Sequence, residues 1–80
     1  MPSNRGTVEL NNYLQSKGML ASLSWIESIS SPRYGPTWTC VCKIDGQVRG
    51  TGTGAQKHVA RDIAASQALN TLMNVINSDG

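Results

Sequence analysis

One long helical pattern near the C-terminal end limits the fold of this chain more than any other feature. Small and apolar side chains recur at helical spacing between Gln56 and Ile76, which predicts one helix over that range. Because many of these side chains are alanines, the helix can lie close to a sheet, and the predicted core is thin and alanine-rich. The pattern consists of Ala60, Ala64, Ala65, Ala68, Leu69, Leu72, Met73 and Ile76.

A second pattern, with a period of two, precedes that helix and predicts a half-buried strand. From Thr37 to Ile44, bulky and apolar side chains alternate with Thr, Val and Lys, as expected for a sheet with one covered face. Asp45 and Gly46 then predict a tight hairpin turn, and the chain returns as a strand from residue 47 to about residue 51. The covered face of the first of these strands is predicted to carry Trp38, Cys40, Cys42 and Ile44.

The remaining elements complete the order helix, strand, strand, strand, helix. Thr7 is the predicted N-cap of a short amphipathic helix that Gly18 ends, and a first strand is predicted over residues 25–29. Residues 30–36 form a predicted loop, and a tight glycine-rich corner at Gly50, Gly52 and Gly54 leads into the long helix. This order argues for an α+β sandwich in which two helices pack on one face of a three-stranded antiparallel sheet.

Length and composition place this sandwich in a single domain. Eighty residues without an internal repeat leave room for one small core, so we expect a folded unit over residues 7–76, with flexible ends at residues 1–6 and 77–80. Phe is absent, and Trp25 and Trp38 are expected in the core rather than as base-stacking platforms. The first twenty residues contain no continuous apolar run, so we expect an intracellular protein, cytoplasmic or nuclear, without a membrane span.

The sequence offers little for catalysis or metal binding. Seven Lys and Arg against five Asp and Glu give a net charge of +2, which is too mild to indicate a nucleic-acid binder by charge alone. Cys40 and Cys42 would point to the same face of a strand, where a disulfide would be strained, so core packing is the expected role of both. Without paired carboxylates, an activated nucleophile or a cluster of metal ligands, we expect no enzyme, no metal and no cofactor.

Three segments have the order and spacing of motifs from a known family. Residues 10–13 read Leu-Asn-Asn-Tyr, residues 31–38 read Ser-Pro-Arg-Tyr-Gly-Pro-Thr-Trp, and residues 50–61 read Gly-Thr-Gly-Thr-Gly-Ala-Gln-Lys-His-Val-Ala-Arg. They resemble, in turn, the Leu-Asn-Glu-Leu/Tyr, Gly-Pro-x-His-x-Pro-x-Phe and Gly-x-Gly-x-Gly-x-Ser-Lys-Lys-x-Ala-Lys motifs of the double-stranded RNA-binding domain family. The resemblance extends from about Thr7 to Leu72 and implies a module that binds the shape and backbone of an A-form RNA duplex, largely without sequence preference.

The resemblance also implies which residues contact RNA. In this family the first helix meets the shallow minor groove, which implies contacts from Asn12 and Gln15. The loop between the first two strands enters a second minor groove, which implies Arg33 and Tyr34, with a Tyr34 ring folded over the loop as the alternative. The start of the long helix approaches phosphates across the major groove. Helical rotation of about 100 degrees per residue gathers the cations of that start into one predicted patch of Lys57, His58 and Arg61.

The chain departs from the family pattern at several of these contact positions. Asn12 stands where the family usually has Glu, Tyr34 where it has His, and His58 where it has a second Lys. Ser31 and Gln56 likewise replace Gly and Ser. Each change keeps a polar or hydrogen-bonding group, but weaker RNA binding is compatible with them. The sequence therefore leaves a second hypothesis open, a protein-interaction or homodimerisation module of the same fold with weakened or lost RNA binding.

Overall fold

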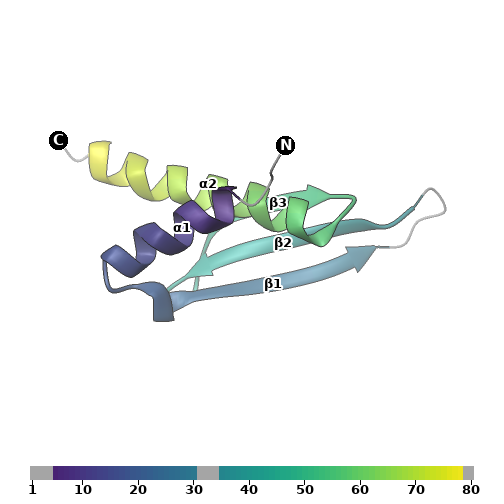
Figure 1. The fold of residues 1–80 in the computed structure, drawn as a ribbon, viewed down its shortest axis with the longest axis horizontal. Helices are drawn as coiled ribbons and strands as arrows, with labels where there is room; N and C mark the ends of the chain where they lie inside the picture. Colours follow the sequence, from purple (N-terminus) through teal and green to yellow (C-terminus); the bar gives the residue numbers. More distant parts are fainter. Residues whose placement is uncertain (1–4, 31–34, 79–80) are drawn as a thin grey trace.

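The computed structural model describes residues 5–30 and 35–78 of the chain and has the predicted order of elements (Figure 1). Three strands form one antiparallel sheet in the order β1-β2-β3, and both helices lie on the same side of it. The predicted α+β sandwich is confirmed. Its elements are α1 (Arg5–Ser16), a single 3-10 turn η1 (Leu20–Ser22), β1 (Leu23–Ser30), β2 (Thr37–Ile44), β3 (Gln47–Gly54) and α2 (Lys57–Ser78).

Both helices reach further than the sequence predicts. Helix α1 begins at Arg5, so the prediction of Thr7 as its N-cap is wrong, and α2 continues to Ser78. Thr7 lies in the first turn of α1, where its backbone N–H has no partner within the helix. That N–H instead donates to Oδ1 of Asp62 on α2 at 2.9 Å, and the Thr7 hydroxyl lies 3.3 Å from the same oxygen. A carboxylate from the second helix therefore caps the first one.

The end of α1 follows the prediction. Gly18 has a φ of +69°, a conformation that glycine adopts without strain. The N–H of Met19 donates to the carbonyl of Leu14 at 2.8 Å, and the N–H of Gly18 donates to that of Gln15 at 3.1 Å. These two bonds form a Schellman motif, which turns the chain toward the sheet.

The sheet keeps the predicted second strand and hairpin. Strand β2 covers Thr37–Ile44 as expected, and the turn residues Asp45 and Gly46 have φ values of 56° and 79°, as a two-residue hairpin turn requires. Strand β1 is longer than predicted, and its register pairs Trp25 with Cys42 and Glu27 with Cys40. Because paired residues point to the same face of a sheet, Glu27 is directed toward the side that carries the helices.

The glycines before α2 have a different role from the one predicted. Strand β3 continues to Gly54, so Gly50 and Gly52 lie inside the strand and do not form a corner. A Cβ on Gly50 would overlap the carbonyl oxygen of Ala64, and one on Gly52 would overlap the carbonyl oxygen of Ala60. The glycines therefore leave no side chain where the backbone of α2 rests on the strand. The alanines of α2 were predicted to let the helix lie close to the sheet, and the glycines of β3 contribute to the same close approach.

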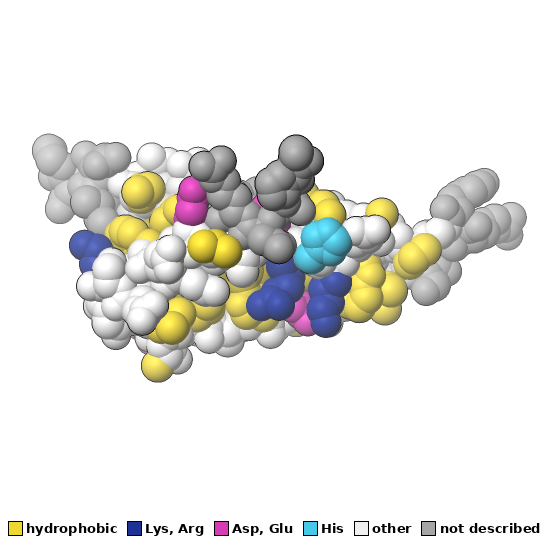
Figure 2. All heavy atoms as spheres, in the orientation of Figure 1, with side chains coloured by type: hydrophobic (Ala, Val, Ile, Leu, Met, Phe, Trp, Pro, Cys, Tyr) yellow, Lys and Arg dark blue, Asp and Glu magenta, His cyan; other side chains and the backbone are white. Residues whose placement is uncertain are grey.

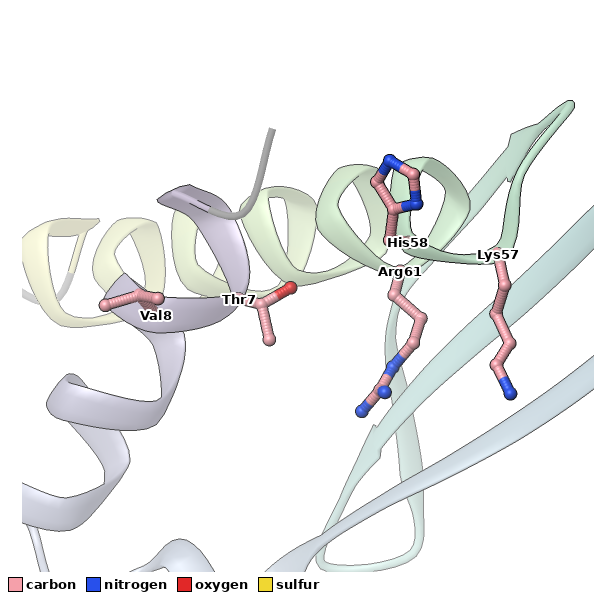
Figure 3. Close-up of a pocket in the computed structure, with 5 residues that line it drawn as sticks. All are labelled: Thr7, Val8, Lys57, His58 and Arg61. Atoms are coloured by element: carbon pink, nitrogen blue, oxygen red, sulfur yellow. The ribbon is translucent and has the colours of Figure 1, made fainter. Parts of the chain in front are cut away.

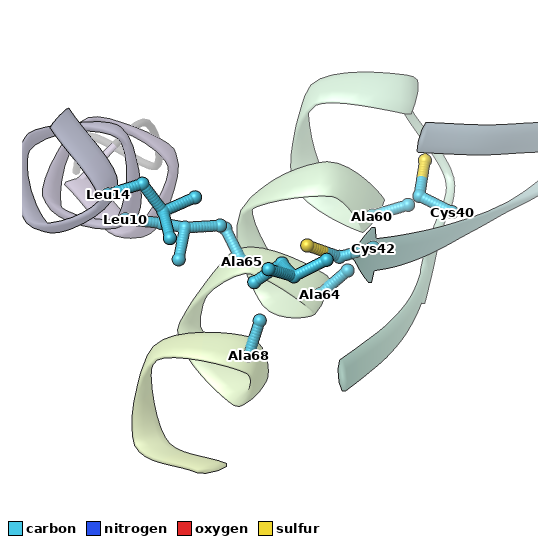
Figure 4. Packing of buried hydrophobic residues seen from close by; sticks show 9 residues of the cluster. Leu10, Leu14, Cys40, Cys42, Ala60, Ala64, Ala65 and Ala68 are labelled. Atoms are coloured by element: carbon cyan, nitrogen blue, oxygen red, sulfur yellow. The ribbon is translucent and has the colours of Figure 1, made fainter. Parts of the chain in front are cut away.

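The core between the helices and the sheet is small, as predicted. In Figure 4, leucines from α1 and alanines from α2 point toward the two cysteines of β2. Trp25 and Trp38 are partly buried and pack against this cluster, which agrees with their predicted place. Both cysteines are free thiols, and burial raises the pKa of the Cys42 thiol to about 11. The cluster consists of Leu10, Leu14, Cys40, Cys42, Ile44, Ala60, Ala64, Ala65 and Ala68.

The other face of the sheet is open. Both helices pack on the opposite side, and no other element of the described chain covers this face (Figure 1). The register directs Ile26, Val41, Lys43 and Val48 to it, among serines and threonines. Ile26 and Val48 are 51% and 58% exposed.

Replacement of Gly52 by Ala should destabilise the fold strongly. The added methyl group has no free volume between β3 and the backbone of α2, and such overpacking costs about 3 kcal/mol where the backbone itself must move. The control is Thr51→Ala, because Thr51 is the exposed neighbour on the open face and its replacement should change stability by less than about 1 kcal/mol. Urea unfolding of both variants measures the difference. Equal stabilities would show that the close approach is not required.

Candidate nucleic-acid interface

A groove lies where the first turns of the two helices meet. It has a volume of about 430 Å³ and is lined by Thr7 and Val8 of α1 and by three side chains of α2, Lys57, His58 and Arg61 (Figure 3). Figure 2 shows dark blue, cyan and magenta side chains gathered over the start of α2. The structure therefore brings all three predicted cations of α2 to one groove.

Within the groove, the cations do not share one direction. The side chains of Lys57 and Arg61 run toward the sheet, whereas His58 projects to the other side of the helix (Figure 3). Lys57 Nζ lies 3.4 Å from Oε1 of Glu27, and Arg61 Nε lies 3.2 Å from Oε2 of the same carboxylate. The patch is thus divided into two parts. Lys57 and Arg61 are paired with Glu27, whereas the imidazole of His58 is exposed.

The same two cations also make cation–π contacts with tryptophans of the sheet. Lys57 Nζ lies 5.4 Å from the ring centre of Trp38, and the guanidinium carbon of Arg61 lies 4.7 Å from that of Trp25. A cation at these distances is attracted by the negative face of the ring. Helix α2 packs on β3 and β2, so the long side chains of its first turns cover the helix-facing side of β1.

The buried thiol of Cys40 lies beneath this cluster. The Sγ of Cys40 donates a weak hydrogen bond to the carbonyl of Lys57 over 3.8 Å. Burial and, second, the carboxylate of Glu27 raise the pKa of the Cys40 thiol, against the opposing effects of Arg61 and Lys57. A thiol with a raised pKa is a poor nucleophile near neutral pH. Among the described residues, no group of His, Cys, Asp and Glu side chains could hold a metal ion.

The exposed side of α1 continues the groove. Val8, Asn12 and Gln15 are spaced by four and three residues, which places them within a sector of about 60 degrees on the helix. All three are exposed, and Val8 already lines the groove. Asn12 and Gln15 therefore extend a single surface that begins at the cations of α2, whereas Asn11 is half-buried. Arg33 and Tyr34, the two predicted loop contacts, lie outside the described residues.

Sequence reasoning missed Glu27 and Val8. The signal for Glu27 was its position two residues after Trp25, which directs a charged side chain to the covered face of the sheet. The signal for Val8 was an apolar side chain at helical spacing from Asn12 and Gln15. Neither signal identifies a partner, because the partners lie on α2, about thirty or more residues further along the chain.

Comparison with protein families identifies the class of this fold and surface. A family model described as the double-stranded RNA binding motif matches residues 8–72, and no curated protein matches the chain. The chain belongs to the double-stranded RNA binding motif family. This membership supports double-stranded RNA binding in general, and the motif is a binding domain rather than a catalytic one. Among the described residues, no helix is both long and apolar enough to cross a membrane.

Proposed function

We propose that the chain binds A-form RNA duplexes through their backbone and groove shape, with little preference for sequence. The observation that carries this proposal is the continuous surface formed by the groove at the start of α2 and by the exposed side of α1. One part of it offers cations and the other offers amides. A-form RNA presents the same two kinds of partner side by side, phosphates along a narrow major groove and hydroxyls in a shallow minor groove.

The start of α2 suits the phosphates of the major groove. Lys57 acts as a point charge, and the planar guanidinium of Arg61 can donate two parallel hydrogen bonds to one phosphate. Both lie in the first two turns of α2, where the unpaired N–H groups and the helix dipole favour an anion. His58 adds a third donor that lines the same groove but is directed away from these two side chains. The contacts fall on phosphate oxygens, which carry no sequence information.

The exposed side of α1 suits the minor groove. The amides of Asn12 and Gln15 can both donate and accept hydrogen bonds, as 2′-hydroxyls and base edges require. Family resemblance adds Arg33 and Tyr34 of the loop between β1 and β2 as contacts to a second minor groove. Domains of this family span about 16 base pairs in this way, and we propose the same arrangement for this chain.

A second candidate function is a protein-interaction or homodimerisation module. The observation that favours it is the open face of the sheet, where Ile26 and Val48 are 51% and 58% exposed. Pairing of Lys57 and Arg61 with Glu27 would also agree with weakened RNA binding. A module of this kind should bind duplex RNA no better than duplex DNA or single-stranded RNA, so one set of titrations separates the two candidates.

Titration at fixed salt should show tighter binding to duplex RNA than to duplex DNA or single-stranded RNA. Lys57→Ala and Arg61→Ala should each weaken binding to unrelated RNA duplexes by a similar factor, and should reduce the slope of log affinity against log salt by up to about one. Lys43→Ala is the control, since it removes the same charge on the open face of the sheet. Losses confined to one RNA sequence, or equal losses for Lys43→Ala, would contradict backbone contact by the groove.

His58 should contribute to duplex binding as a hydrogen-bond donor to phosphate. It lines the same groove as Lys57 and Arg61, and its side chain is directed away from theirs (Figure 3).

Two substitutions of His58 test this contact. His58→Lys should tighten binding to duplex RNA, because the Lys side chain carries a permanent charge near neutral pH. His58→Ala should weaken binding, because the donor is lost. Titration of both variants with duplex RNA measures the effect, and an unchanged affinity for His58→Ala would exclude His58 from phosphate contact.

A further inference from the structure

Glu27 presents an anion to the two cations that the proposed function assigns to phosphate. Its oxygens divide between them, with Oε1 3.4 Å from Lys57 Nζ and Oε2 3.2 Å from Arg61 Nε. The side chain of Glu27 is 25% exposed, compared with 48% for Lys57 and 36% for Arg61. The carboxylate is therefore the more deeply placed member of the cluster, on a strand whose register fixes its position.

The contact with Arg61 supplies charge without good hydrogen-bond geometry. Nε of Arg61 is shielded from solvent and makes no hydrogen bond, although the carboxylate oxygen lies 3.2 Å away. A phosphate that meets the guanidinium in its plane can form two aligned, charge-assisted bonds. Partly exposed ion pairs are weak, so phosphates of a duplex can replace this partner. When phosphates take the two cations, Glu27 loses both partners. This loss opposes RNA binding.

We propose that Glu27 is an internal competitor for phosphate. In the free protein it holds Lys57 and Arg61 against Trp38 and Trp25, and a duplex must draw both cations away from it to bind. Glu27 thereby lowers the affinity of the groove for RNA. This inference rests on the proposed function, because it assigns the same two cations to RNA phosphates.

Glu27→Gln tests the inference, since it removes the charge and keeps the size of the side chain. The variant should bind duplex RNA about 2- to 10-fold more tightly than the wild type at about 0.1 M salt, the range expected when partly exposed ion pairs are released. Glu27→Asp keeps the charge on a shorter side chain that cannot reach both cations at once, so a smaller gain is expected.

Asp45→Asn is the matched control, because it raises the net charge by the same amount and suits the hairpin turn. Asp45 follows the end of β2 and lies five residues after Cys40, the partner of Glu27, or roughly 16 Å at the rise of a strand. This exceeds the screening length of about 10 Å at 0.1 M salt, so the control should change affinity less than about 2-fold.

A coupling measurement separates competition from a general effect of charge. In a chain that carries Lys57→Ala and Arg61→Ala, no cations remain to be released, so most of the gain from Glu27→Gln should disappear. A full gain in that background, or a gain equal to that of Asp45→Asn, would overturn the inference.

Two further outcomes distinguish this inference from the proposed function. If Lys57→Ala and Arg61→Ala weaken binding but Glu27→Gln weakens it too or leaves it unchanged, the proposed function stands and Glu27 is not a competitor. If neither the wild type nor Glu27→Gln prefers duplex RNA over duplex DNA and single-stranded RNA, the proposed function fails and the inference fails with it.

Discussion

The close approach of α2 to β3 is the contact on which the rest of the structure depends. Gly50 and Gly52 carry no side chains where the backbone of α2 passes, and Ala60 and Ala64 are small enough to rest there. This packing sets the height of α2 above the sheet. At that height Arg61, in the second turn, reaches β1 and meets the ring of Trp25 and the carboxylate of Glu27.

The same packing fixes where α1 lies. Leu10 and Leu14 are fully buried against the cluster that the alanines of α2 complete. Asp62 of α2 then caps the first turn of α1 through the N–H of Thr7. The start of one helix is thereby held beside the start of the other, which forms the groove. Because the net charge is only +2, the proposed contact with a polyanion rests on this placement rather than on overall charge.

Much of the fold could be predicted because local signals determine it. The alternation along β2, the Asp45-Gly46 turn and the end of α1 at Gly18 each depend on a few neighbouring residues. The role of Gly50 and Gly52 could not be predicted in this way, since it depends on which face of β3 meets the helix. The same limit applies to the N-terminus of α1, where the cap comes from Asp62, 55 residues away.

The cations of the candidate site could be predicted from the sequence, but Val8, Glu27 and the pairing with Glu27 could not. The cations at the start of α2 follow from the family motif, and the structure brings Lys57, His58 and Arg61 to one groove. Glu27 pairs with Lys57 and Arg61 but not with His58. This pairing depends on the register between β1 and β2, which residue spacing alone does not give. Whether these residues contact RNA is the proposal itself, and the loop residues Arg33 and Tyr34 lie outside the described part of the chain.

Amide chemical shifts of the isotopically labelled chain, followed during titration with an RNA duplex of about 16 base pairs, test the proposed interface most directly. The central claim is that one surface, formed by the exposed side of α1 and the first turns of α2, meets the duplex. The largest shift changes should then occur together at Val8, Asn12, Gln15, Lys57, His58 and Arg61. Changes concentrated instead at Ile26, Val41 and Val48, on the open face of the sheet, would contradict this claim.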